Sequence, residues 1–210
     1  MRIEDLSFSY SDSLLFDKFG LHLPDRRIIA LMGDSGIGKT TLLDLIAGIR
    51  KPHSGRIMRF DDETLRDDVA DGRSHSIGYA FSKPVFFPYC SVLRNLEIAC
   101  AGARNAIESI NDGVAFFGVG DVSDKRPHKL SSGQIQRFNV IRAFACRPAI
   151  VLLDEPAEHL DADTEARMRE YILEHSKGRT VILATHDRTE AETLADDIVF
   201  LGGRPVGAFR

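Results

Sequence analysis

The stretch that decides the fold is IIALMGDSGIGKTTLLDLIAG, which spans residues 28–48. It opens with the apolar run Ile28–Met32, continues through eight residues of the pattern G-x-x-x-x-G-K-[ST], and closes with the helical pattern of Thr41–Gly48. A buried strand, a glycine-rich loop and a helix in this order form the context in which the pattern binds phosphate. The residues expected to contact a nucleotide are Gly33, Asp34, Ser35, Gly36, Ile37, Gly38, Lys39, Thr40 and Thr41.

The residue types of this loop suit the triphosphate of a nucleotide, which we expect to be ATP. Glycines let successive backbone N–H groups turn towards the phosphates, and the following helix adds the positive end of its dipole. Lys39 would reach the β- and γ-phosphates, where it would serve catalysis, and the Thr40 hydroxyl would be a ligand of Mg²⁺. The sequence therefore predicts ATP and Mg²⁺ as the bound groups.

The remaining pattern indicates an α/β fold with a mostly parallel sheet. Two further short apolar runs, Ile150–Leu153 and Val181–Ala184, have no polar face, as is typical of strands covered by helices on both sides. Helical stretches alternate with these strands, at Gln134–Cys146 and Thr164–His175.

Two carboxylates end one of these strands, in the order Asp154-Glu155-Pro156. The carboxyl end of a buried strand is where α/β proteins bind ligands. Asp154 would hold Mg²⁺ through water, and Glu155 would act as the general base that polarises the attacking water. The alternative is an ordinary turn at a strand end that also caps a helix.

Length and charge limit the possible functions. The 210 residues suit a single domain over 1–210, and the segment at about 84–145, which has no clear buried strand, is expected to form a helical lobe. Lys and Arg number 27 against 31 Asp and Glu, a net charge of -4, so a strongly basic nucleic-acid surface is not expected. The acidic stretch Asp61–Arg73 is expected to be a solvated loop or a short helix.

Cysteine usage and hydropathy indicate the compartment. The N-terminus, MRIEDLSFSY, lacks the apolar region of a secretory signal. The odd set Cys90, Cys100 and Cys146 has no metal-type spacing and fits a reducing cytosol better than a disulfide framework. No apolar run approaches the ~20 residues of a membrane-spanning helix, so another chain would have to supply any span.

The segment LSSGQ, from Leu130 to Gln134, strongly resembles the signature motif of the ATP-binding cassette (ABC) family. The resemblance runs from Leu6 to Gly207. It implies a P-loop NTPase core, an N-terminal antiparallel β subdomain, and a helical subdomain inserted between the Q-loop and the signature. By the same resemblance Tyr10 is the adenine-stacking aromatic; the alternative is an inward residue of an alternating strand.

The resemblance also implies a mechanism shared by two subunits. They would pack head to tail and sandwich two ATP molecules, each between one subunit's phosphate loop and the other's signature. Ser131 and the Gly133 amide, with Gln134 in the same motif, would bind the γ-phosphate across the interface. His186 would contact and sense that phosphate, unless it is an ordinary strand-end histidine. Asp161, at the end of the D-loop, would help to link the two sites.

Two residues depart from the family pattern. Ser82 stands where the Q-loop glutamine usually ligates Mg²⁺, and its hydroxyl is a shorter oxygen ligand. Ser132 stands where the signature usually has glycine. Both changes affect the expected rate of hydrolysis more than ATP binding.

The function that we predict is an ATPase subunit that powers a membrane transporter, of the bacterial importer type. Its partners would be a second, identical ATPase subunit, transmembrane permease subunits and a substrate-binding protein, with no nucleic acid. It would lie on the cytoplasmic face of the membrane, where Phe86, Phe87 and Tyr89 would line the groove for the permease or form the lobe's core. The alternatives are a soluble ABC-type ATPase acting on nucleic acid or ribosomes, and a slow or binding-only switch subunit.

Overall fold

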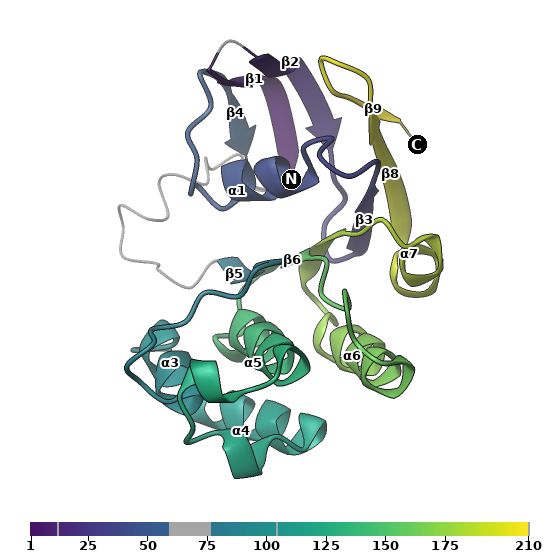
Figure 1. Ribbon diagram of the computed structural model, residues 1–210. Coiled ribbons are helices and arrows are strands. Elements are labelled where there is room, and N and C mark those ends of the chain that lie inside the picture. The colour runs from purple at the N-terminus through teal and green to yellow at the C-terminus, as the bar shows by residue number, and fades with distance from the viewer. Residues whose placement is uncertain (12, 59–76, 104, 210) are drawn as a thin grey trace.

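The computed structural model describes residues 1–11, 13–58, 77–103 and 105–209. Figure 1 shows an N-terminal sheet at one end of the molecule, a larger sheet beside and below it, and a group of helices at the other end. The acidic stretch Asp61–Arg73 lies outside the described residues, so the expectation of a loop or short helix there stays a prediction.

Six strands form the larger sheet, in the order β5-β6-β7-β3-β8-β9. All neighbours are parallel except β8 and β9, which pair antiparallel, so the predicted mostly parallel sheet is confirmed. The bounds are β3 (Ile28–Met32), β5 (Ile77–Ala80), β6 (Ile150–Asp154), β7 (Thr180–Ala184), β8 (Asp197–Gly202) and β9 (Gly207–Phe209).

Helices cover both faces of this sheet, which explains its wholly apolar strands. Val151 and Leu153 of β6 pack into the hydrophobic cluster around α5 (Ser132–Ala145), whereas Ile150 and Leu152 pack into the cluster around α1 (Lys39–Ile46). Every residue of β3, β6 and β7 is therefore buried. The helices are α1 (Lys39–Ile46), α5 (Ser132–Ala145), α6 (Ala162–His175) and α7 (Arg188–Leu194).

The N-terminal sheet is antiparallel, with strands β1 (Arg2–Tyr10), β2 (Ser13–His22) and β4 (Ser54–Met58) in the order β2-β1-β4. Leu6 and Phe8, which alternate with Ser7 and Ser9, are buried, while Tyr10 at the strand end is 44% exposed. The antiparallel β subdomain implied by the family resemblance is confirmed.

Helices α3 (Val92–Ala99) and α4 (Ala106–Phe117) pack with α5 at the end of the molecule away from the N-terminal sheet, as Figure 1 shows. Two short 3₁₀ turns, Gly120–Val122 and Pro127–Lys129, lead into the signature segment. No strand occurs among the described residues from 81 to 149, in agreement with the predicted helical insert.

Two cysteines correct the sequence interpretation. Cys100 ends α3, Cys146 ends α5, and the structure joins them in a disulfide with the Cα atoms 5.4 Å apart. Cys90 is free. The interpretation that no disulfide forms was wrong for this pair, because the ends of two helices 46 residues apart meet only in the folded lobe.

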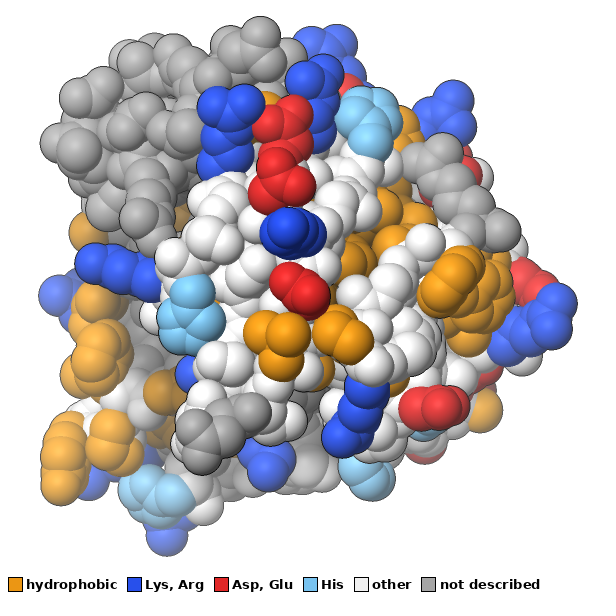
Figure 2. Space-filling view, turned by 90° about the horizontal axis from the view of Figure 1, so that it is seen from above, with side chains coloured by type: hydrophobic (Ala, Val, Ile, Leu, Met, Phe, Trp, Pro, Cys, Tyr) orange, Lys and Arg blue, Asp and Glu red, His pale blue; other side chains and the backbone are white. Residues whose placement is uncertain are grey.

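The surface charge is mixed. On the face shown in Figure 2, seen from above, basic and acidic side chains are interspersed. Several of the arginines of the N-terminal sheet and α1 region form ion pairs, such as Arg56 with Glu4 at 2.8 Å and Arg50 with Asp44 at 3.0 Å. Within the described residues, no helix is both long and apolar enough to cross a membrane.

Candidate active site

The predicted phosphate-binding, catalytic and metal residues lie at the ends of four neighbouring strands, at one edge of the sheet. Ser82 lies just after β5, Glu155 after β6, His186 after β7, and the glycine-rich loop after β3. Because parallel strands end at the same edge, the order β5-β6-β7-β3 brings these distant segments together. The sheet topology thus assembles one site from segments that are widely separated along the chain.

The glycine-rich loop needs glycine at defined positions. Gly33 has φ 150°, and a Cβ atom there would lie 2.5 Å from the Leu201 carbonyl oxygen of β8. Gly38 has φ 120° and precedes α1 as its N-cap without a side-chain hydrogen bond. The N-terminus of α1 therefore presents backbone N–H groups with no capping side chain and no acidic residue in its first turn. This arrangement favours an anion.

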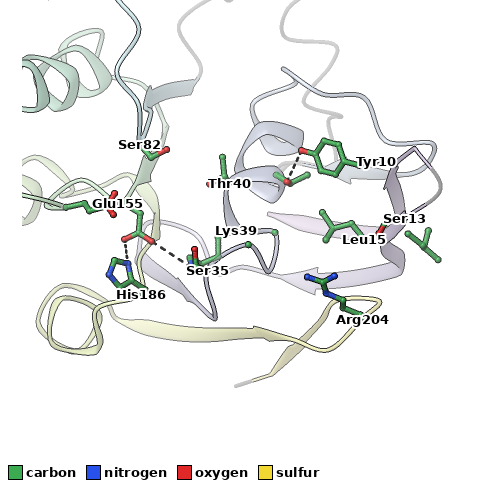
Figure 3. Close-up of a pocket in the computed structure, with 15 residues that line it drawn as sticks. Tyr10, Ser13, Leu15, Ser35, Lys39, Thr40, Ser82, Glu155, His186 and Arg204 are labelled. Atoms are coloured by element: carbon green, nitrogen blue, oxygen red, sulfur yellow. Dashed lines mark hydrogen bonds and ion pairs between the residues drawn. The ribbon is translucent and has the colours of Figure 1, made fainter.

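A cavity of about 550 Å³ lies over this loop (Figure 3). Half of the predicted nucleotide-binding residues line it, whereas Gly33, Asp34 and Ile37 of the loop do not, and neither do Ser131, Gly133, Gln134 and Asp161. The lining residues are Tyr10, Ser13, Leu14, Leu15, Ser35, Gly36, Gly38, Lys39, Thr40, Thr41, Ser82, Glu155, Glu158, His186 and Arg204.

Lys39 is held inside the loop. Its Nζ atom donates to the Gly33 carbonyl oxygen at 2.7 Å and to that of Asp34 at 3.4 Å, and lies 3.8 Å from Glu155 Oε1. The side chain is only 7% exposed. A buried ammonium group held mainly by carbonyl oxygens is ready to exchange those partners for phosphate oxygens.

Asp154 and Thr40 form an oxygen-rich pair beneath the cavity. The Thr40 hydroxyl donates to Asp154 Oδ2 at 2.8 Å, while Oδ1 is buried and has no hydrogen-bond partner among the described residues. Burial raises the pKa of Asp154, and the bond from Thr40 opposes that rise. An orphaned carboxylate oxygen beside two hydroxyls, those of Thr40 and Ser82, is a donor set that fits Mg²⁺.

Glu155 is fixed by contacts from three directions. Its backbone has φ 49°, and its N–H donates to the Ala184 carbonyl oxygen of β7 at 2.9 Å. One carboxylate oxygen, Oε2, lies 2.9 Å from His186 Nδ1, and this hydrogen bond raises the pKa of His186. Gln136 of α5 donates to the Pro156 carbonyl oxygen at 3.1 Å and so ties the same turn to the helical lobe. Sequence reasoning assigned Gln136 no role.

Tyr10 stands at the opposite end of the cavity in a constrained position. Its hydroxyl is 3.1 Å from Thr41 Oγ1, and Phe8 meets its ring edge-on at 5.1 Å. The Arg50 guanidinium lies over the ring, 5.0 Å from its centroid. A ring that is 44% exposed and fixed in this way can offer a face to a base, so the stacking role stays a prediction with a suitable geometry.

The signature segment and Asp161 both cap helices. Ser131 accepts from the Gln134 N–H at 3.2 Å, and Gln134 Oε1 accepts from the Ser131 N–H at 3.0 Å, which is a capping box at the start of α5. Asp161 caps α6 by accepting from the Thr164 N–H at 3.0 Å, which lowers the pKa of its carboxyl. Their roles across a subunit interface stay predictions.

Glu190 is a site neighbour that the sequence analysis missed. It lies in the first turn of α7 and is 3% exposed, and no described residue is hydrogen-bonded to its Oε1 atom. It borders a cavity of about 220 Å³ together with Glu155 and His186. Burial raises the pKa of Glu190 from 4.5 to about 7, and the nearby Glu155 and Asp187 add to the rise.

Replacing Glu190 with Gln is expected to remove a pH-dependent loss of stability. Between pH 4.5 and 7 the native Glu190 keeps a proton that the unfolded chain has released. The free energy of unfolding therefore falls as pH rises through this window. Urea unfolding measures the effect. The free energy of unfolding of Glu190→Gln, taken relative to that of wild type, should rise by about 2 kcal/mol between pH 5 and pH 8. The exposed Glu174→Gln is the control, and an equal pH dependence in wild type and Glu190→Gln would contradict the assignment.

Comparison with known proteins agrees with this geometry. A family model described as ABC transporter matches residues 16–158. The chain belongs to the ABC transporter family. It is 33% identical over 205 residues to the probable sulfate/thiosulfate import ATP-binding protein CysA of Chlorella vulgaris, covering 95% of this chain and 86% of that protein. It is 39% identical over 188 residues to the molybdenum import ATP-binding protein ModC of Brucella suis biovar 1, covering 86% of this chain and 52% of that protein.

The fold of this ABC chain also matches solved structures. The dimeric structure of MJ0796, a bacterial ABC transporter cassette, superimposes with a TM-score of 0.85 at 24% identity, covering 95% of this chain and 93% of that one. The predicted family, the α/β fold and the assignment as an ATPase subunit of a transporter are therefore confirmed. The chain spans about half the length of the molybdenum import relatives that it matches.

Proposed function

We propose that this chain is the ATP-hydrolysing subunit of a membrane importer, and that two copies close around ATP to drive transport. The observation that carries the proposal is the split placement of the family's motifs. Lys39, Glu155 and His186 face one cavity, whereas Ser131 and Gly133 of the signature do not line it. A site that binds the γ-phosphate with both sets of residues needs a second subunit.

The start of α5 supports this composite site. Ser131 and Ser132 are exposed, and α5 continues for 14 residues from Ser132, so its positive N-terminal end faces solvent. A partner's γ-phosphate placed there would meet the free N–H groups of the first turn. Gly133 leaves room for this approach, because even a Cβ atom at this position would meet only Leu160, in ordinary contact at 3.5 Å.

The chemistry that we propose follows from the contacts within the loop. Arrival of the triphosphate would draw Lys39 from the Gly33 and Asp34 carbonyl oxygens to the β- and γ-phosphates. Glu155 would then be free of its ion pair with Lys39 and could accept a proton from the attacking water. Mg²⁺ held by Thr40, Asp154 and Ser82 would neutralise charge on the phosphates.

His186 would complete the response to the nucleotide. Its Nδ1 atom is bonded to Glu155 in the structure, so its other ring nitrogen is available for a γ-phosphate oxygen. Loss of that phosphate on hydrolysis removes the contact and weakens the closed dimer, which is a ligand-driven switch. The same pair thus links the general base to the group that senses the phosphate.

The helical lobe offers a surface for a membrane subunit. We call residues 85–89, which precede α3, the docking segment. Val85, Phe87 and Tyr89 in it are 68%, 60% and 85% exposed. Its backbone is nevertheless fixed, because the buried Asn95 side chain accepts from the Phe87 N–H at 2.6 Å and Arg142 donates to the Val85 carbonyl oxygen at 2.6 Å. Rigidly presented apolar side chains are typical of an interaction surface.

The partners and location follow from this proposal. Permease subunits would bind the docking segment and hold the ATPase at the cytoplasmic face of the membrane, and a substrate-binding protein would deliver the cargo on the other side. The named relatives import sulfate or thiosulfate and molybdenum, and this chain would serve an importer of the same type. The mixed charge of the visible face and the net charge of -4 do not favour nucleic acid as the partner.

Co-purification from membranes tests the transporter role. The tagged chain should bring down a multispanning membrane protein in stoichiometric amount from detergent-solubilised membranes. Phe87→Asp with Tyr89→Asp should lose that protein while ATP binding is unchanged, since neither residue lines the nucleotide cavity. Leu173→Asp, at an exposed apolar position on α6, is the control. Recovery of no membrane protein, or equal recovery with the double variant, would contradict the proposal.

A further inference from the structure

The connection between β8 and β9 reaches the nucleotide cavity from a part of the chain that no motif covers. Gly202 pairs with Gly207 in the antiparallel β8–β9 hairpin, so residues 203–206 form its tip. Arg204, within this tip, lines the cavity of the glycine-rich loop. Figure 3 shows Arg204 on the side of the cavity away from Ser82 and Glu155, with its guanidinium directed towards the loop.

Two close contacts fix this hairpin against the walls of the cavity. On one side, the Leu201 carbonyl oxygen approaches Gly33 so closely that a Cβ atom there would lie only 2.5 Å away. On the other side, the Val206 N–H donates to the Leu15 carbonyl oxygen of β2 at 2.8 Å, and Val206 is 4% exposed. The tip is therefore held between the start of the phosphate loop and the wall that β2 forms.

Among the described residues, none neutralises the charge of Arg204. No hydrogen bond, ion pair or ring contact joins its guanidinium to any described residue. The other cationic groups around the cavity do have partners: Lys39 is bonded to Gly33, His186 to Glu155, and Arg50, over Tyr10, to Asp44. Arg204 is thus the cation that remains available to a ligand among the described residues of the cavity wall.

The position of Arg204 along the cavity indicates which part of the ligand it meets. Lys39 and the N-terminus of α1 occupy the end that suits the β- and γ-phosphates, and Tyr10 marks the end that suits the base. Figure 3 shows Arg204 beside Leu15 and Ser13 of β2, on the same side of the cavity as Tyr10, with its guanidinium directed towards the loop that carries Ser35 and Lys39. A guanidinium there matches a phosphate oxygen pair better than it matches an uncharged sugar.

We propose that Arg204 binds the α-phosphate of the nucleotide. The proposal rests on the proposed ATP site and adds a binding residue outside all the motifs of the chain. The guanidinium would close the cavity beside the ribose and stabilise ATP and ADP alike, because both carry the same α-phosphate. It takes no part in the chemistry at the γ-phosphate.

Calorimetric titration of the full chain with ATP and ADP tests this contact. Arg204→Gln should lower the affinity for ATP and for ADP by the same factor, about tenfold, as expected for the loss of a charge-assisted hydrogen bond. The affinity of Arg204→Lys should lie between those of Arg204→Gln and wild type, because lysine keeps the positive charge but lacks the paired N–H donors of the guanidinium. Arg27→Gln, at an exposed position at the opposite end of β3, removes the same charge and should bind as wild type does.

Sulfur-substituted nucleotides locate the contact. Wild type should prefer one diastereomer of ADP carrying sulfur at the α-phosphorus, and Arg204→Gln should bind the two diastereomers alike. Unchanged affinity of Arg204→Gln overturns the proposal. A loss confined to ATP, or a loss with the diastereomer preference retained, also overturns it, because the arginine would then meet the γ-phosphate or the ribose. If wild type bound neither nucleotide, the ATP site itself would be wrong.

Discussion

Replacement of Lys39 by alanine is expected to abolish ATP binding, with a loss of affinity of about two orders of magnitude or more. The Lys39 ammonium is 7% exposed and lies on the cavity wall, bonded to two loop carbonyl oxygens that a triphosphate would replace. Without it, the β- and γ-phosphates would lose their only buried cationic partner among the described residues of the cavity. Calorimetric titration with ATP measures the effect.

Lys177→Ala provides the matched control for this variant. Lys177 is exposed in the turn before β7, at the edge of the sheet opposite to the site. The Lys177→Ala variant should bind ATP as wild type does. Thermal unfolding of both variants separates a lost contact from a lost fold, and tight ATP binding by a folded Lys39→Ala variant would refute the assignment of the phosphate loop.

Replacement of Glu155 by glutamine is expected to slow hydrolysis by a factor of about 10² to 10⁴, the usual contribution of a general base. The amide keeps the size of the side chain and can still meet His186, but it cannot take a proton from water. ATP binding should persist, so an ATP-bound dimer should accumulate. Phosphate release measures turnover, and gel filtration with ATP measures the dimer.

Glu158→Gln is the comparison for Glu155→Gln. Glu158 lines the same cavity, one turn further along the chain. Its carboxylate lies 3.8 Å from His159 and acts on His186 through its charge, whereas Glu155 is hydrogen-bonded to His186. We expect this variant to keep most of the wild-type turnover. Intact hydrolysis by Glu155→Gln, with no ATP-dependent dimer, would count against Glu155 as the base.

Local patterns were sufficient to predict the parts of the site that follow buried strands. The run Ile28–Met32 with its glycine-rich loop, and the run Ile150–Leu153 with its two acids, carry both the strand and the ligand group in one continuous segment. His186 also follows closely on β7, but its role was predicted from the family resemblance and not from the local pattern. The sheet order then places these segments at one edge.

Other features depend on packing between distant segments and left no local signal. Arg204 reaches the cavity only because its hairpin docks on β2 and on the phosphate loop. Glu190 resembles any acidic residue in the first turn of a helix until its burial is known. Cys100 and Cys146 meet because α3 and α5 end side by side. The metal role of Ser82 remains a prediction, supported by its position beside Asp154.

Mixing two inactive variants tests the central claim, that each ATP site is built from two subunits. Lys39→Ala lacks the phosphate loop cation, and Gly133→Asp places a negative charge where the partner's γ-phosphate would lie, at a helix position that tolerates a side chain. In a mixed dimer one site combines both defects and the other has neither. Random mixing should restore about a quarter of the wild-type hydrolysis rate, because half of the dimers have one intact site. No recovery in the mixture would contradict a site shared between subunits.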